Sequence, residues 1–269
     1  MSPARRTPVL LLHGAWLHAS SWQGWTRSLT SRGYAVSAPR WPGEPDTVAA
    51  TRADPSGWRG LGLAALTAHY ARVARSFDTP PVLIGHCVGG LIAQHLLGAN
   101  LARAAVALAP LPPGDLTGPV VAWPAVPESP GEPGRLSRSA FREIYANAVD
   151  AGEATALYGR HVVPMPQRLL GDIAARSAAG QPGLPVDTGN RDRGPLLLVS
   201  GQEDRLAPDS MTRAMYKRYG DSVAVSELAQ FADRGHSLVI DSGWHGIAEH
   251  VLGWLTDHGI PAEAGGAQF

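Results

Sequence analysis

Three side chains that can act together in nucleophilic catalysis stand after different apolar runs of this sequence. Cys87, the only cysteine of the chain, lies in GHCVGG, between an apolar run and a helix-like run. Asp204 follows another apolar run by four residues, and His236 stands in a Gly-His turn after the last such run. A thiol, an imidazole and a carboxylate can supply the nucleophile, the base and the group that orients the base in acyl transfer.

The surroundings of Cys87 predict a sharp turn from strand to helix. Gly85 and Gly89 stand two residues on either side of the cysteine. Such a turn strains the residue at its tip and brings the flanking positions together, so these positions must be small. The start of a helix also favours negative charge and lowers the pKa of a thiol placed there. A buried cysteine that packs as a small hydrophobe is the alternative, and the motif context favours the nucleophile.

The proposed partners of Cys87 have simpler alternatives too. His236 could be a hydrogen-bonded loop histidine, and Asp204 could only cap its turn. Asp115, which follows the preceding apolar run, is the alternative acid. Glu203 is adjacent to Asp204, and we expect it to point elsewhere.

The elements that must position these residues can be read from short apolar runs separated by segments with helical periodicity. Near-continuous apolar strands that alternate with helices indicate a parallel sheet covered on both faces, so the fold class is α/β. We expect helices at Leu61–Phe77 and Met211–Tyr219. The expected strands are Val9–Leu12, Tyr34–Ala38, Val82–Ile84, Ala104–Ala109, Leu196–Ser200 and Val223–Leu228.

The alternation breaks between residues 112 and 193, where no strand is expected and prolines cluster in WPAVPESPGEPG. Three helices are predicted there, at Arg138–Val149, Gly152–His161 and Pro166–Ser177, and Asp150 with Glu153 matches a capping box. We therefore expect a helical cap over residues 112–193, inserted into a core formed by residues 1–111 and 194–269.

The order of nucleophile, acid and histidine, each after a successive strand, resembles the α/β-hydrolase fold family. The resemblance implies a mainly parallel, doubly wound sheet of about six strands with an inserted helical cap. It also implies an oxyanion hole formed by two backbone N–H groups. One would belong to Val88, after the nucleophile, and the other to Ala15 in LLLHGAW.

The cysteine is a departure from the family pattern, because most relatives carry serine at this position. The chain resembles cysteine-type hydrolases and thioesterases of the family, and Dieckmann cyclases that act on carrier-bound thioesters. A Ser-to-Cys variant of a serine esterase would have the same sequence feature. In each case Cys87 is the expected nucleophile.

The expected reaction passes through a covalent acyl-thioester on Cys87, formed from an ester or thioester with a largely apolar acyl group. From a thioester donor this intermediate is nearly isoenergetic with the substrate, so thioesters are favoured. The acceptor could be water, an amine, an alcohol or a carbanion, which leaves hydrolysis, acyl transfer and ring closure in natural-product biosynthesis open. No cofactor and no metal is expected, because neither a metal-ligand spacing nor a phosphate loop occurs.

Recognition of a small-molecule acyl substrate is expected mainly in the cap, although the same apolar side chains could simply pack the cap onto the core. Arg135, Arg138 and Arg142 recur at near-helical spacing and could meet the phosphate of a pantetheine arm, as in coenzyme A or an acyl carrier protein, or could form a solvated face. The expected substrate contacts are Trp16, Trp123, Phe141, Tyr145, Tyr158 and Met165, with Val162 and Val163 beside them.

Composition excludes several other classes. The formal net charge is zero, so nucleic acid and anionic membranes are not attracted, and no run of about 18 apolar residues could span a bilayer. A single cysteine and the absence of a secretory leader indicate a cytoplasmic protein, and the preference for arginine, with Lys217 the only lysine, indicates a GC-rich bacterial genome. Cys87 excludes enzymes of this fold with an aspartate nucleophile. A hydroxynitrile lyase would normally carry a lysine near the nucleophile, whereas Lys217 lies on a predicted helix well past the strand that precedes Asp204, so a lyase is disfavoured. A non-catalytic receptor on a hydrolase fold is the remaining alternative.

Overall fold

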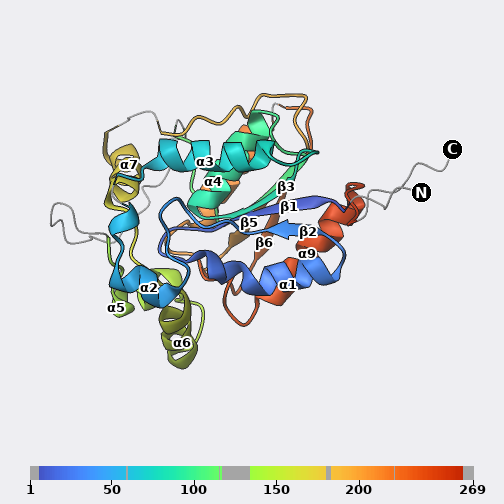
Figure 1. The fold of residues 1–269 in the computed structure, drawn as a ribbon. Helices are drawn as coiled ribbons and strands as arrows, with labels where there is room; N and C mark the ends of the chain where they lie inside the picture. Colours follow the sequence, from blue (N-terminus) through green and yellow to red (C-terminus); the bar gives the residue numbers. More distant parts are fainter. Residues whose placement is uncertain are drawn as a thin grey trace.

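The computed structural model describes residues 6–58, 60–114, 116, 134–179, 183–220 and 222–262, and a six-stranded parallel sheet lies at its centre (Figure 1). The order of the strands is β2-β1-β3-β4-β5-β6. The chain therefore places β2 on one side of β1 and all later strands on the other side, so the strand order changes direction between β1 and β3. The predicted α/β class and the number of strands are confirmed. The strands are β1 (Pro8–Leu12), β2 (Ala35–Ser37), β3 (Val82–His86), β4 (Ala104–Leu108), β5 (Leu196–Gly201) and β6 (Ser226–Phe231).

The central strands are apolar because helices cover both of their faces. Every residue of β3, β4 and β5 is buried, whereas the edge strands β2 and β6 are partly exposed. The prediction for the last strand was wrong by three residues at its start. Val223 and Val225 favoured an earlier strand by their β-propensity, but they precede β6 and are exposed, at 78% and 47%.

Helices pack on the two faces of the sheet in pairs. Figure 1 shows α3 and α4 on one face and α1 and α9 on the other. Of these, α4 directly follows β3 and is buried along almost its whole length. The helices outside the β4–β5 segment are α1 (Gln23–Ser31), α2 (Val48–Ala53), α3 (Leu63–Arg75), α4 (Val88–Gly98), α8 (Asp209–Arg218) and α9 (Trp244–Asp257), with short 3-10 turns η1 (Ala19–Trp22) and η2 (Ser56–Trp58).

The β4–β5 segment, residues 112–193, contains helices and no strand among its described residues, as expected. These helices are α5 (Arg138–Ala140), the π-helical turn η3 (Phe141–Tyr145), α6 (Ala151–His161) and α7 (Gln167–Ala179). The helix predicted over Arg138–Val149 ends early, because it widens at Phe141, whose carbonyl accepts the N–H of Ala146 five residues later. The division into a core and a cap stays a prediction.

The capping box predicted for α6 forms only on one side. The Asp150 carboxylate accepts the N–H of Glu153 at 2.8 Å, as an N-cap does. The Glu153 carboxylate does not turn back to the cap. It accepts the N–H and the hydroxyl of Ser242, at 2.5 and 3.1 Å, and so joins the start of α6 to the loop before α9.

The end of α6 is joined to the loop that follows β1. The His161 carbonyl accepts the N–H of His18 at 3.2 Å, and the Trp16 carbonyl accepts the N–H of Val163 at 2.9 Å. Leu17 and Val162 form an antiparallel bridge between these two contacts. In Figure 1, α5, α6 and α7 lie with α2 at the end of the sheet opposite to the chain termini. The β4–β5 segment is thus attached to the segment that follows Gly14 and Ala15.

Among the helices that the structure describes, none combines the length and the apolar character that a membrane span requires.

We expect His161 to make the fold sensitive to mild acid. Its side chain is 9% exposed, and its Nδ1 has no hydrogen-bond partner. Burial, with the charges of Arg160 and His18, lowers the pKa of His161 from 6.5 to about 4. Because the unfolded chain binds this proton more readily, the stability contributed by neutral His161 is complete above pH 6.5 and is lost as the pH falls toward 4.

Urea unfolding between pH 7 and pH 4 measures this effect as a loss of the free energy of unfolding. His161→Gln should lose less stability than the wild type over that range. His250→Gln removes an exposed histidine of α9 and should follow the wild type. Equal pH dependence of His161→Gln and the wild type would contradict the prediction.

Candidate active site

Cys87 occupies a strained turn between β3 and α4. Its backbone has φ 56° and ψ −118°, a conformation that residues with a side chain rarely adopt. The flanking glycines are required by close backbone packing. A Cβ at Gly85 would lie 2.2 Å from the carbonyl oxygen of Gly89, and a Cβ at Gly89 would lie 2.2 Å from that of Leu12. The GHCVGG segment therefore has the local geometry of an elbow that presents the side chain at its tip.

Two loops meet at the elbow. A Cβ added to Gly14 would lie 2.8 Å from the Cβ of Cys87, so the loop after β1 passes directly beside the cysteine. Within the described residues, the N–H groups of Ala15 and Val88 donate no hydrogen bond. Val88 is the first residue of α4, where N–H groups lack an intrahelical partner. Within the described residues, the two N–H groups expected to form an oxyanion hole are thus unpaired donors next to Cys87, one on the loop after β1 and one at the start of α4.

His236 and Asp204 form a buried pair. The Nδ1 of His236 donates to the Asp204 Oδ2 at 2.7 Å, and neither side chain is exposed. The other carboxylate oxygen of Asp204 accepts the N–H groups of Leu206 and Ala207, at 2.8 and 2.7 Å. The carboxylate is therefore fixed by the backbone of its own turn, and it in turn fixes the tautomer of the imidazole.

The free side of His236 is influenced by Cys87. Its Nε2 is buried without a hydrogen-bond partner among the residues that the structure describes. Burial alone would lower the pKa of His236, but the electrostatic effects of Asp204 and Cys87 outweigh it and raise the pKa to about 10. The protonated imidazole of His236 is thus stabilised by Asp204 and Cys87 together.

His86, which the sequence analysis did not single out, braces the turn that carries His236. Its Nε2 donates to the backbone carbonyl of His236 at 3.0 Å, and the two rings lie 4.7 Å apart. Burial first, and then the nearby positive charge of His236, hold the pKa of His86 well below its usual value, so it stays neutral. Only its position next to Cys87 could have drawn attention to it.

Tyr145 of η3 packs against His236. The ring of Tyr145 meets that of His236 edge to face at 4.6 Å, and it stacks on Phe141 at 5.0 Å. The Tyr145 hydroxyl donates a long hydrogen bond of 3.4 Å to the carbonyl of Ala15. Burial, and then the charges of Cys87 and Asp204, raise the pKa of Tyr145 well above its usual value, so it remains a neutral donor.

The other residues expected to contact substrate are distributed over two places. Trp16 and Met165 are buried and both bond to Gly134, Trp16 through its indole N–H at 3.2 Å and Met165 through a β-bridge. Tyr158 is half-buried and lies in a separate pocket with Val162 and Val163. Trp123, and the alternative acid Asp115, lie outside the described residues.

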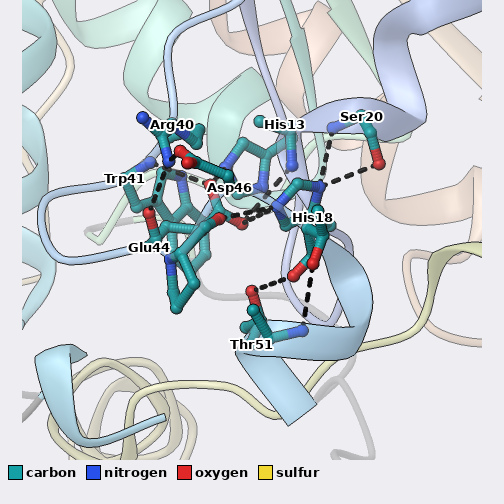
Figure 2. A network of polar contacts seen from close by, with 12 residues as sticks. His13, His18, Ser20, Arg40, Trp41, Glu44, Asp46 and Thr51 are labelled. Atoms are coloured by element: carbon teal, nitrogen blue, oxygen red, sulfur yellow. Dashed lines mark hydrogen bonds and ion pairs between the residues drawn. The ribbon is translucent and has the colours of Figure 1, made fainter. Parts of the chain in front are cut away.

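A second buried carboxylate, which the sequence did not indicate, lies beneath the loop after β1 (Figure 2). The Glu44 Oε2 accepts the N–H of Trp41 at 3.1 Å and lies 3.4 Å from the His13 Nε2. The Glu44 Oε1 accepts the N–H of Ala19 at 3.4 Å and lies 3.9 Å from the His18 Nε2. Glu44 thus joins both ends of the segment from residue 13 to residue 19, which contains Ala15.

Glu44 is held as a carboxylate in spite of its burial. Burial raises the pKa of Glu44, but His13, through charge and hydrogen bonding, together with His18 and the N–H of Trp41, outweighs it and leaves the pKa below its usual value. His13 also stacks on Trp41 at 4.4 Å and donates from Nδ1 to the carbonyl of Gly14 at 3.3 Å. The loop that adjoins Cys87 is therefore anchored by a buried charge.

The family of the chain follows from a comparison with known proteins. The model of the alpha/beta hydrolase family matches residues 9–250. This match spans most of the chain, and the fold agrees with it, so the chain belongs to the alpha/beta hydrolase family. A search of curated protein sequences finds no match to this chain.

Solved structures with the same fold include several enzymes. The methylesterase MES16 from Arabidopsis aligns with a TM-score of 0.64 and 16% identity, over 93% of this chain and 99% of that one. A monoacylglycerol lipase from Paleococcus ferrophilus has a TM-score of 0.63 and 17% identity, over 93% and 94%. A pyrethroid hydrolase from Sphingobium faniae JZ-2 has a TM-score of 0.62 and 17% identity, over 93% and 97%. At such identities the likeness establishes the fold.

Glu44→Ala should destabilise the protein strongly. It leaves buried imidazoles and two buried N–H groups without their acceptor, and removal of one partner of a buried charged pair typically costs about 3–5 kcal/mol. Urea unfolding at neutral pH measures the loss. Glu249→Ala is the control, because Glu249 pairs with Arg32 at the surface, where a bridge is worth up to about 1 kcal/mol. Similar losses in the two variants would contradict an anchoring role for Glu44.

Proposed function

We propose that the chain is a hydrolase of esters or thioesters that carries its acyl group on Cys87. One observation carries the proposal: a strained, glycine-flanked cysteine stands beside a buried His236–Asp204 pair, and the pKa of His236 responds to that cysteine. Membership in the alpha/beta hydrolase family supports it. Similar folds in a methylesterase, a lipase and a pyrethroid hydrolase also support an ester substrate.

In the proposed mechanism, the Cys87 sulfur attacks the acyl carbonyl carbon after its proton has passed to the Nε2 of His236. The oxyanion that forms accepts hydrogen bonds from the N–H groups of Ala15 and Val88, and loss of one such donor typically costs about 3 kcal/mol. His236 returns the proton to the leaving thiol or alcohol as the carbonyl re-forms. Water, deprotonated by His236, then attacks the thioester. The bond between the acyl carbon and the Cys87 sulfur breaks, and His236 returns the proton to the sulfur as the acid is released.

The buried aromatic side chains around the site favour a largely apolar acyl group. Tyr145 packs against His236 and stacks on Phe141, and Trp16 and Met165 are buried where the β4–β5 segment meets the loop after β1. Such surroundings exchange water for apolar contacts when an acyl chain binds. Thioesters are the preferred donors in this proposal, because exchange of one thioester for another is close to balanced in free energy.

The burial of the reacting groups favours a second candidate function. Cys87 and His236 have no exposed surface. A site closed to bulk water protects an acyl-thioester from hydrolysis. The acyl group could then pass to a bound amine, alcohol or carbanion, which makes the chain an acyltransferase or a cyclase acting on a carrier-bound thioester. The identity of the released product distinguishes the two functions.

Intact-mass spectrometry with acyl thioesters tests the nucleophile. The wild type should gain the mass of one acyl group, and peptide mapping should place it on Cys87. Cys87→Ala should form no adduct and release no product. Cys87→Ser should still hydrolyse esters if the chain tolerates the more common nucleophile of the family. Free acid among the products indicates hydrolysis, whereas an amide, ester or cyclic product indicates transfer or ring closure.

Two outcomes would contradict the proposal. An adduct that persists in Cys87→Ala would move the nucleophile elsewhere. Saturable ligand binding by the wild type, without acylation or turnover of any ester or thioester, would replace the enzyme with a receptor built on the same fold.

A further inference from the structure

A positively charged cavity lies on the side of the β4–β5 segment, apart from the Cys87 side chain. Its volume is about 280 Å³. The three charged groups in its wall are arginines, one from α2, one from the start of α5 and one from the segment that precedes α5. The lining residues are Arg52, Arg135, Leu136, Arg138, Tyr158, Val162, Val163 and Pro164.

Arg52 is oriented by the backbone of this segment. Its Nε donates to the carbonyl of Val162 and its Nη2 donates to that of Tyr158, both at 2.7 Å. Within the described residues, its Nη1 donates no hydrogen bond. A guanidinium fixed in this way keeps donors for a ligand and has lost most of its side-chain freedom before the ligand arrives.

The guanidinium of Arg138 lies against the aromatic ring of Tyr158, as that of Arg52 does. Arg138 lies 5.3 Å from the centre of the Tyr158 ring, and Arg52 lies 5.9 Å from it. The Tyr158 hydroxyl donates to the carbonyl of Leu136 at 2.9 Å, which fixes the ring between α6 and the start of α5. Two guanidinium groups thus contact the Tyr158 ring, and Arg135 is the third guanidinium group that lines the cavity.

No carboxylate among the residues that the structure describes pairs with Arg135 or Arg138. Three guanidinium groups around one cavity repel one another, and an anion bound between them removes that cost. Guanidinium donors match the several oxygens of a phosphate in geometry and charge. A phosphate therefore fits this cavity better than an apolar or cationic group does.

The cavity adjoins the loop of the proposed oxyanion hole. Val162 forms a bridge with Leu17, and Val163 donates to the carbonyl of Trp16. Ala15 is the residue before Trp16. One wall of the cavity is therefore hydrogen-bonded to the segment that would hold the reacting carbonyl.

We propose that this cavity binds a phosphate group of an acyl thioester donor whose acyl group reacts at Cys87. The choice of an acyl thioester as the ligand rests on the proposed function. The set of arginines differs by one residue from the set named in the sequence analysis. Arg135 and Arg138 line the cavity, but Arg142 does not, and Arg52 takes its place. The structure assigns the recognition to Arg52, Arg135 and Arg138.

Steady-state kinetics with three donors of one acyl group tests the proposal. Acyl-pantetheine has no phosphate, acyl-4′-phosphopantetheine has one, and acyl-coenzyme A adds the nucleotide. Arg138→Gln should raise the KM for a phosphorylated donor about tenfold, as expected for loss of a charge-assisted hydrogen bond, and leave the KM for acyl-pantetheine unchanged. An effect on both phosphorylated donors assigns the pantetheine phosphate, and an effect on acyl-coenzyme A alone assigns the nucleotide phosphates.

Arg142→Gln is the matched control. It removes the same charge from an exposed residue of η3, a few positions from Arg138 and outside the cavity. It should leave the KM for every donor at the wild-type value. Equal effects of Arg138→Gln and Arg142→Gln would mean that only the general charge of this face matters, and would overturn the proposal.

Calorimetric titration with inorganic pyrophosphate tests the cavity without catalysis. The wild type and Arg142→Gln should bind it alike, and the double variant Arg135→Gln/Arg138→Gln should bind at least about tenfold more weakly. If this holds while no thioester is turned over, the proposed function fails and the anion site stands. If the wild type does not bind pyrophosphate, or the double variant binds it equally well, the site is refuted even if Cys87 is acylated.

Discussion

The site depends on the contact of backbone with backbone at the turn after β3. The carbonyl of Gly89 occupies the space that a Cβ of Gly85 would need, and the carbonyl of Leu12 does the same for Gly89. The end of β1, the tip of the turn and the start of α4 can approach only because these positions have no side chain. The positive φ of Cys87 costs about 1–3 kcal/mol. The fully buried strands and α4 hold the turn in this conformation.

Two buried carboxylates then fix the groups around this turn in the same manner. Asp204 accepts two backbone N–H groups and one imidazole, and Glu44 accepts two backbone N–H groups and lies beside two imidazoles. A buried carboxylate without such donors would lose its charge or unfold the site. Asp204 orients His236, and Glu44 anchors the loop that adjoins Cys87. The position of each charged group is thus determined by backbone geometry.

The alternation of apolar and helical segments was sufficient to predict the α/β class, because buried parallel strands leave a strong pattern in sequence. It failed where apolar residues are exposed, as at Val223 and Val225 before β6. The glycines around Cys87 pointed to a turn because their spacing reflects a local constraint. Glu44 and His86 could not be found, because their partners are distant in sequence and only the fold brings them together. The proximity of Arg52 to Arg138 could not be predicted for the same reason, because α2 precedes α5 by more than eighty residues.

Helix α6 is fastened at both ends to segments that carry groups of the site. Its first turn holds Ser242 through Glu153, and Ser242 follows Asp241, which accepts the hydroxyl of Ser237 next to His236. Its last residue, His161, holds His18 on the loop that contains Ala15. A rigid-body displacement of this helix would release the histidine side and the amide side together. The two sides of the candidate site are therefore coupled through the position of one helix.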